Sequence, residues 1–169
     1  MVSTRWWRFA ENFMKCGCEC LLKTDSSLAA MIARLTLAAV FIPHGLQMTL
    51  GMFGGYGFEG TMGYFTTQAS LPWLVAFLIV MAESVGAVCL ALGFMTRFCA
   101  ASLAIVMLGA IVMVHIPHGF FMNWFGVQQG EGYEYHILAI GLALSLIVSG
   151  GGRCSIDGML SKKKSCCAA

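Results

Sequence analysis

Charged side chains are scarce in this sequence. Asp, Glu, Lys and Arg make up 11% of the 169 residues, and 59% are hydrophobic, whereas soluble domains carry about 25% charged residues. This composition excludes an ordinary water-soluble domain, and it excludes a disordered chain, which needs low hydrophobicity. The net charge of +2 is too small to indicate nucleic-acid binding. The sequence therefore predicts a small protein embedded in a membrane.

Basic residues and cysteines are absent from two stretches, 49–71 and 117–132. In a chain with four spans, all ten Lys and Arg then fall on one side of the membrane. Because basic connections stay in the cytoplasm, we expect both termini there and the two stretches outside. Cysteines on the cytoplasmic side stay reduced, so we expect no disulfide framework. The spacing of Cys16, Cys18 and Cys20 is tighter than that of zinc-binding pairs, and we expect no metal site there.

Four apolar segments approach the length of about 20 residues that a helix needs to cross a membrane. The fourth is the shortest and reaches ~26 Å only when its polar first residues are counted. The expected fold class is all-α: an integral membrane four-helix bundle with cytoplasmic N and C termini. The bundle occupies 28–152, between an interfacial amphipathic segment over 1–27 and a basic, cysteine-containing tail over 153–169. The expected spans are 28–48, 72–92, 98–116 and 133–149.

Two charged residues interrupt the apolar spans, and charges inside a membrane are candidates for function. Arg34 lies in the first span and Glu83 in the second, at similar distances from the cytoplasmic ends. Their matched depth on neighbouring antiparallel helices predicts that they contact each other. Such an ion pair either fixes the helix register or leaves Glu83 able to exchange protons with a ligand.

The four histidines, His44, His115, His118 and His136, all lie near the outer ends of the spans. The segment Ile-Pro-His-Gly occurs twice, at 42–45 and 116–119, and each copy is expected to end an outward-running span. The glycine- and aromatic-rich stretch after the first copy is expected to form a lid over a site at the outer face.

A series of motifs runs from about Arg34 to Asp157. It consists of Arg34, Phe41-x-x-His44-Gly45, Gly54-Gly55-Tyr56-Gly57-Phe58, Leu71-Pro72, Ala82-Glu83, Leu92-Gly93-Phe94-x-Thr96-Arg97, His115, Gly119-Phe120-Phe121, Glu134-Tyr135, Gly150 and Ser155-Ile156-Asp157. In their order and spacing these motifs resemble the DoxX family of small four-helix membrane proteins, and the tails of the chain lie outside the resemblance. The resemblance implies a prokaryotic cytoplasmic (inner) membrane location, and the members of the family include subunits of thiosulfate:quinone oxidoreductase.

The predicted function is that of a membrane subunit of a redox system, which binds or reduces quinone in a pocket in the outer half of the bundle. Reduction of a quinone needs hydrogen-bond donors at two carbonyls and a supply of two protons. The candidate catalytic residues are Glu83, His44, His115 and Tyr135. The candidate cofactor-binding residues are His44, His115, His118, Glu134, His136 and Arg34.

Other functions fit the same residues. His44 and His115 could ligate haem b iron axially, or bind copper together with nearby methionines. The bundle could instead be a non-catalytic anchor or assembly subunit. The chain carries no flavin or dinucleotide fingerprint, so electrons would come from a partner or a small reductant. The expected partners are membrane lipid and either another protein or further copies of this chain.

Overall fold

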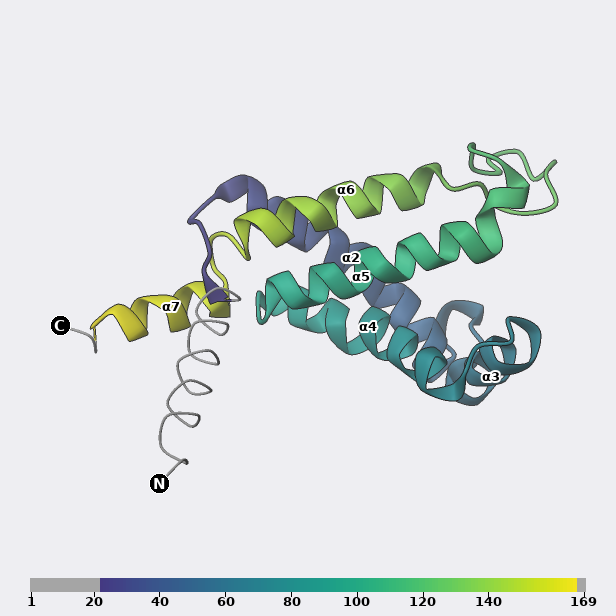
Figure 1. The fold of residues 1–169 in the computed structure, drawn as a ribbon, viewed down its shortest axis with the longest axis horizontal. Coiled ribbons are helices and arrows are strands. Elements are labelled where there is room, and N and C mark those ends of the chain that lie inside the picture. Colours follow the sequence, from purple (N-terminus) through teal and green to yellow (C-terminus); the bar gives the residue numbers. More distant parts are fainter. Residues whose placement is uncertain (1–21, 167–169) are drawn as a thin grey trace, which may run out of the picture.

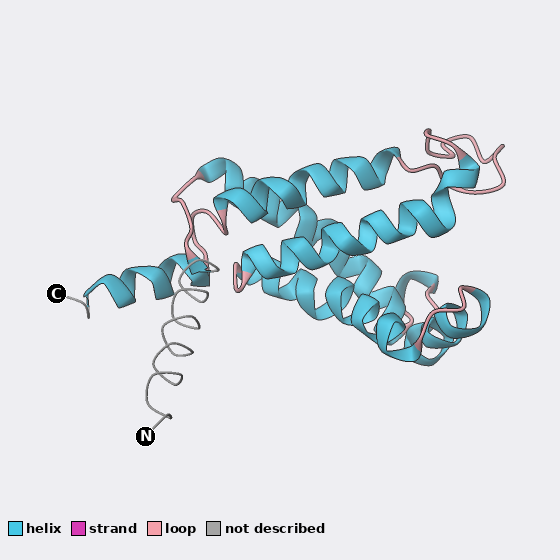
Figure 2. Ribbon diagram, in the orientation of Figure 1, coloured by secondary structure: helices cyan, strands magenta, loops and turns pink. Residues whose placement is uncertain are grey.

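The computed structural model describes residues 22–166, and this part of the chain is helical without any strand (Figure 2). Three helical runs are long and apolar enough to cross a membrane: α2 (Leu28–Leu50), α4 (Trp73–Leu92) and Thr96–His118. A fourth apolar helix, α6 (Glu134–Ser149), is shorter. The all-α class is confirmed, and these helices begin and end within two residues of the predicted spans. The predicted interfacial segment 1–27 lies mostly outside the described residues.

The four apolar helices lie side by side (Figure 1). The third run consists of α5 (Thr96–Ala110) continued by η3 (Ile111–His115) and η4 (Ile116–His118). α2 contacts α4 and α6, and α5 contacts the same two helices. The α4–α5 turn and α7 (Ile156–Cys166) share one end of the molecule, which we call the terminal end. The connections 51–72 and 119–133 share the opposite end, the loop end.

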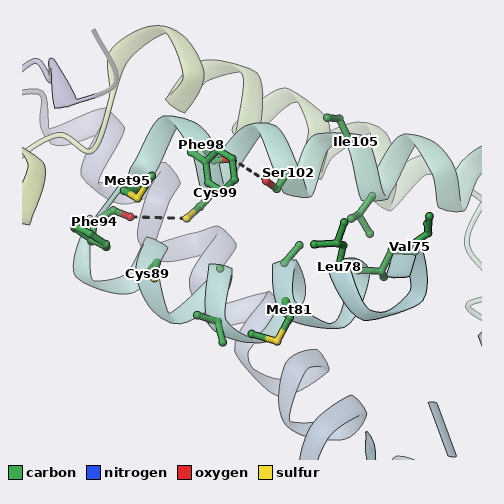
Figure 3. A pocket seen from close by; sticks show the side chains of 15 residues that line it. Val75, Leu78, Met81, Cys89, Phe94, Met95, Phe98, Cys99, Ser102 and Ile105 are labelled. Carbon is green, nitrogen blue, oxygen red and sulfur yellow. Dashed lines mark hydrogen bonds between the residues drawn. The ribbon is translucent and has the colours of Figure 1, made fainter. Parts of the chain in front are cut away.

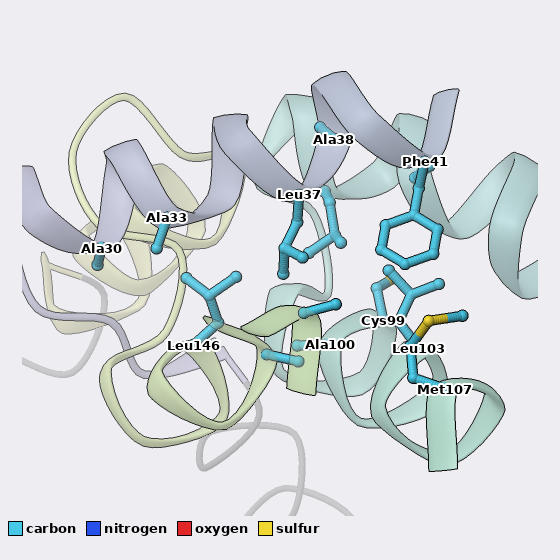
Figure 4. Close-up of a cluster of buried hydrophobic side chains, with 14 residues drawn as sticks. Ala30, Ala33, Leu37, Ala38, Phe41, Cys99, Ala100, Leu103, Met107 and Leu146 are labelled. Atoms are coloured by element: carbon cyan, nitrogen blue, oxygen red, sulfur yellow. The ribbon is translucent and has the colours of Figure 1, made fainter. Parts of the chain in front are cut away.

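Small side chains dominate the contacts between these helices. The main core cluster packs alanines against a few larger residues such as Leu37, Phe41 and Leu103 (Figure 4). Small residues let helix backbones approach closely. In a membrane the surrounding lipid is as apolar as the side chains, so helices associate mainly through such close van der Waals packing. The buried alanines of this cluster are Ala30, Ala33, Ala38, Ala87, Ala100, Ala139 and Ala143.

The glycine- and aromatic-rich connection folds at the loop end into η1 (Met52–Gly54), α3 (Gly57–Gly63) and η2 (Tyr64–Gln68). Met62 of α3 is buried in a small second cluster with Ala76 and Val80 of α4. α3 also contacts α2. The connection therefore packs on α2 and α4.

The two Ile-Pro-His-Gly segments behave differently. The second copy ends its helix as predicted: His118 closes η4, and Gly119 follows with φ 82°. The expectation for the first copy is wrong, because α2 continues through Pro43 to Leu50 and ends at Gly51 with φ 69°. In the second copy, the helical hydrogen bonds just before Pro117 widen to a π-turn, in which Ile116 N–H donates to Ile111 O. A single π-turn of this kind often marks a functional site.

Candidate functional site

Polar side chains from all four apolar helices gather toward the loop end. They comprise His44 of α2, Glu83 of α4, His115 of η3, and Tyr135 and His136 of α6. We call these five residues the loop-end cluster. The rings of His115 and His136 lie 4.0 Å apart, and those of Tyr135 and His136 lie 5.3 Å apart. His136 is within electrostatic range of His44 as well as His115, and Tyr135 is within range of Glu83.

Several polar atoms of the loop-end cluster are buried without a partner. The Tyr135 hydroxyl and His136 Nδ1 have no hydrogen bond. Glu83 is a further buried residue of the cluster, at 6% exposure. A buried polar group without a partner costs about 1–3 kcal/mol, so such groups are expected to meet a water or a ligand. The cluster therefore combines donors and a carboxyl that are free to bind a polar molecule.

His115 has a defined tautomer in this arrangement. Its Nδ1 lies 2.7 Å from Glu131 O. A carbonyl oxygen only accepts, so Nδ1 is the donor, and Nε2 of the neutral ring is an acceptor. His115 can thus take a proton at Nε2 or accept a hydrogen bond there. His44 is exposed, whereas His136 is buried.

A glycine brings α2 against α4 beside the cluster. A Cβ at Gly45 would lie 2.6 Å from both Glu83 O and Ser84 Cα. That distance is shorter than a carbon atom tolerates, so the two backbones meet there only because residue 45 has no side chain. This contact places Glu83 next to the turn of α2 that carries His44.

Two further candidate cofactor-binding residues flank the connection 119–133 at this end: His118 is the last residue of η4, and Glu134 is the first residue of α6. His118 packs over Gly130, where a Cβ would lie 2.5 Å from its Nε2. The Glu134 carboxylate accepts hydrogen bonds of 3.2 Å from Met122 N and from Trp124 Nε1. Glu134 therefore ties the connection 119–133 to the start of α6. A cavity of about 430 Å³ lies here, lined in part by Trp124, Glu134 and Tyr135.

Arg34 lies apart from the loop-end cluster, and the predicted ion pair with Glu83 is wrong. The guanidinium is buried at the terminal end, ten residues and about 15 Å along α2 from His44. It donates to Leu90 O at 3.0 Å and to Ala91 O at 2.6 Å, two carbonyls in the last turn of α4. It also donates to the carbonyls of Arg153 and Cys154, both at 3.2 Å.

Helix geometry explains why Arg34 and Glu83 do not meet. Side chains on an α-helix tilt toward the N-terminus of their own helix. The N-terminus of α2 is at the terminal end, and that of α4 is at the loop end. The two residues are also not level with each other, because Glu83 O lies against Gly45, eleven residues and about 16 Å along α2 from Arg34. The tilt of the side chains in opposite directions adds to this separation.

Two further residues complete the terminal end, and the sequence analysis gave them no role. The buried Asp157 carboxylate accepts hydrogen bonds of 2.9 Å from Met95 N and Thr96 N at the start of α5. Arg97 donates to Ile147 O at 2.8 Å and to Val148 O at 2.9 Å at the end of α6. The sequence carries one sign of this packing. Three consecutive glycines, at 150–152, lie five residues before Asp157, and such a run indicates that the backbone there packs closely against neighbouring elements.

No group of three or more His, Cys, Asp or Glu side chains within residues 22–161 is arranged to hold a metal ion. Cys16, Cys18 and Cys20 lie outside the described residues. Haem ligation by His44 and His115 stays a prediction.

Comparisons with known proteins agree with the resemblance. The DoxX family model matches residues 29–116. The chain is 26% identical over 137 residues to a Bacillus subtilis (strain 168) protein named "Putative oxidoreductase CatD", with 81% of this chain and 90% of the relative covered. It is 30% identical over 129 residues to "Inner membrane protein YphA" of Escherichia coli (strain K12), with 75% and 86% covered. No solved structure matches.

Proposed function

The chain belongs to the DoxX family, a family of membrane proteins, and from this premise we propose that it binds a quinone at the loop-end cluster as the membrane subunit of a redox system. The protein resides in the prokaryotic cytoplasmic membrane, where quinones are dissolved. The relative named as an oxidoreductase supports the redox role. The observation that carries the proposal is the pair of unpartnered buried groups, Tyr135 hydroxyl and His136 Nδ1, beside the buried Glu83.

The residues present fit a quinone head group. A bound quinone supplies the capacity to take up two electrons and two protons. The Tyr135 hydroxyl donates a hydrogen bond to one carbonyl, and His136 donates to another when Nδ1 carries its proton. Glu83 holds a proton in the interior, and Nε2 of His115 receives a proton from the loop end. The buried setting excludes bulk water from the donors and strengthens their hydrogen bonds.

The same proposal includes the membrane arrangement. α6 crosses the membrane as the fourth span, its 16 residues covering about 24 Å, which local thinning of the bilayer accommodates. Leu138 and Val148 of α6 are 70% and 77% exposed, as expected for side chains in lipid. The distribution of basic residues supports a terminal end in the cytoplasm and a loop end outside. The cluster then receives quinone from the membrane and protons from the outer side.

Removing one hydroxyl tests the site. We expect Tyr135→Phe to weaken binding of a short-chain quinone about tenfold, the equivalent of about 1.4 kcal/mol. Tyr133→Phe is the matched control, because Tyr133 lies two residues away and packs against Phe120 instead. Binding is measured by titration of the purified protein in mild detergent. Equal quinone affinity in Tyr135→Phe, Tyr133→Phe and the parent protein would refute the proposed site.

A further inference from the structure

Two cysteines face each other across the α4–α5 hairpin at the terminal end. Cys89 lies three residues before the end of α4, and Cys99 lies three residues after the start of α5. Each is therefore about 4.5 Å from its helix end, which puts the two at the same height on antiparallel neighbours. The Cys99 thiol is within electrostatic range of the Cys89 thiol, and its Sγ lies 3.8 Å from Phe94 O in the turn (Figure 3). Both cysteines are free thiols.

The two cysteines line one apolar groove between α4 and α5. The groove has a volume of about 520 Å³, within the range of small-molecule sites. Apart from the two sulfurs and the Ser102 hydroxyl, its lining side chains are hydrocarbon or thioether, including Leu78, Val85 and Phe98 (Figure 3). Several of them are half exposed, as is Val85 at 50%. A groove of this kind on a lipid-facing surface admits apolar molecules from the bilayer and not ions from water.

We propose that Cys89 and Cys99 are a redox-active dithiol that a quinone in this groove oxidises to a disulfide. Each sulfur loses one proton, and the pair loses two electrons as the S–S bond forms. The quinone takes the two electrons and the two protons on its two oxygens and leaves as a quinol. A lipid-soluble oxidant is required because the groove is apolar. The dithiol lies near the terminal end, away from the loop-end cluster, so this proposal does not depend on quinone binding there.

The first experiment follows the thiols directly. The reduced, purified full-length protein is mixed anaerobically with a short-chain benzoquinone whose ring is fully substituted, so that thiols cannot add to it. Free thiols are then alkylated, and the peptides are examined by mass spectrometry. We expect a peptide pair linked between Cys89 and Cys99, two hydrogens lighter than the reduced pair, and one quinol per link. Cys89→Ser and Cys99→Ser should each abolish the link and its quinol. Alkylation of both thiols after quinone treatment would overturn the proposal.

A second experiment asks whether the oxidant enters through the groove. Val85→Trp fills the groove from its lipid-exposed rim, and Leu144→Trp is the control on α6, where Leu144 is 53% exposed outside the groove. We expect quinone to form the disulfide at least about tenfold more slowly in Val85→Trp than in Leu144→Trp, while the small oxidant diamide oxidises both at the same rate. Equal quinone rates in the two variants would contradict entry through the groove. Tyr135→Phe should leave disulfide formation unchanged, which separates this proposal from that for the loop-end cluster.

Discussion

At the scale of single residues, the buried charge of Arg34 is held by hydrogen bonds to backbone carbonyls, with the Asp157 carboxylate within electrostatic range. Arg34 is 1% exposed and donates to four carbonyl oxygens. Two of these end α4, where the helix dipole favours a cation. The planar guanidinium can reach several acceptors at once, which a lysine ammonium cannot do in the same geometry. Arg34 thus joins α2 to the end of α4 and to the segment that precedes α7.

Replacing this arginine should be costly. We expect Arg34→Met to lower the free energy of unfolding by about 3–5 kcal/mol, because four buried or partly buried carbonyl bonds lose their charged donor. Arg153→Met is the control, since Arg153 is exposed and, among residues 22–161, its side chain donates only to Ser26 O. Unfolding in mixed micelles of mild detergent and SDS measures both variants. Equal stabilities of the two would show that the four bonds contribute little.

At the scale of elements, residues distant in sequence determine where helices end. α5 begins at Thr96, and no side chain near Thr96 caps it. Asp157 supplies the cap from more than sixty residues downstream. Local signals therefore predict the existence of α5 but not the residue that fixes its first turn.

Asparagine at position 157 should keep only part of this cap. Both Asp157 oxygens accept a backbone N–H, whereas an amide has one oxygen and its NH₂ group cannot accept. We expect Asp157→Asn to destabilise the protein by about 1–2 kcal/mol, the usual value of a helix cap. The exposed Asp25 provides a matched Asp→Asn control with an expected change near zero. The SDS titration described for Arg34 reports both changes, and equal shifts in the two variants would contradict the capping role.

Close contact between α2 and α4 gives another prediction at this scale. Gly45→Ala adds a carbon 2.6 Å from the backbone of α4, and we expect it to cost about 1–3 kcal/mol as the helices separate. Gly141→Ala on α6 is the control, because nothing lies within 4 Å of its added carbon. It should be neutral or up to about 1 kcal/mol more stable. Thermal unfolding in detergent distinguishes the two, and a stable Gly45→Ala variant would show that the helices can shift freely.

The sequence predicted the helices well because long apolar runs determine them directly. It predicted the gathering of His44, His115 and Tyr135 at one end, since depth along a span follows from counting residues. It failed for the pairing of Arg34 with Glu83, because Glu83 packs at the level of Gly45 on α2 and because side chains tilt toward the N-terminus of their own helix. It also failed to predict that α2 continues through Pro43. A proline is tolerated inside a membrane helix when neighbouring helices or local adjustments satisfy the backbone groups that it frees.

At the scale of the whole molecule, the two ends differ in the kind of polar group that they gather. The terminal end bonds the charged groups of Arg34, Arg97 and Asp157 to the ends of three helices. Each end also keeps two buried polar atoms without a partner: Arg34 Nε and Thr96 Oγ1 at the terminal end, and the Tyr135 hydroxyl and His136 Nδ1 at the loop end. The charged groups of the terminal end are thus engaged by backbone, whereas the loop end offers the side chains of Tyr135 and His136 to a polar ligand. Between them the surface is apolar, as with Ile105 at 71% exposure.

The orientation of these ends in the membrane can be measured with thiol reagents. Cys154 is exposed at the terminal end, and Gln129 is exposed in the connection 119–133 at the loop end. Because the stretches 49–71 and 117–132 at the loop end contain none of the ten Lys and Arg, we expect the terminal end to face the cytoplasm. An impermeant maleimide applied to intact spheroplasts should then label Gln129→Cys in a background without other cysteines. It should leave a variant that retains Cys154 alone unlabelled until the cells are lysed. Labelling of Cys154 before lysis would invert the topology, and the loop-end cluster would then take its protons from the cytoplasm.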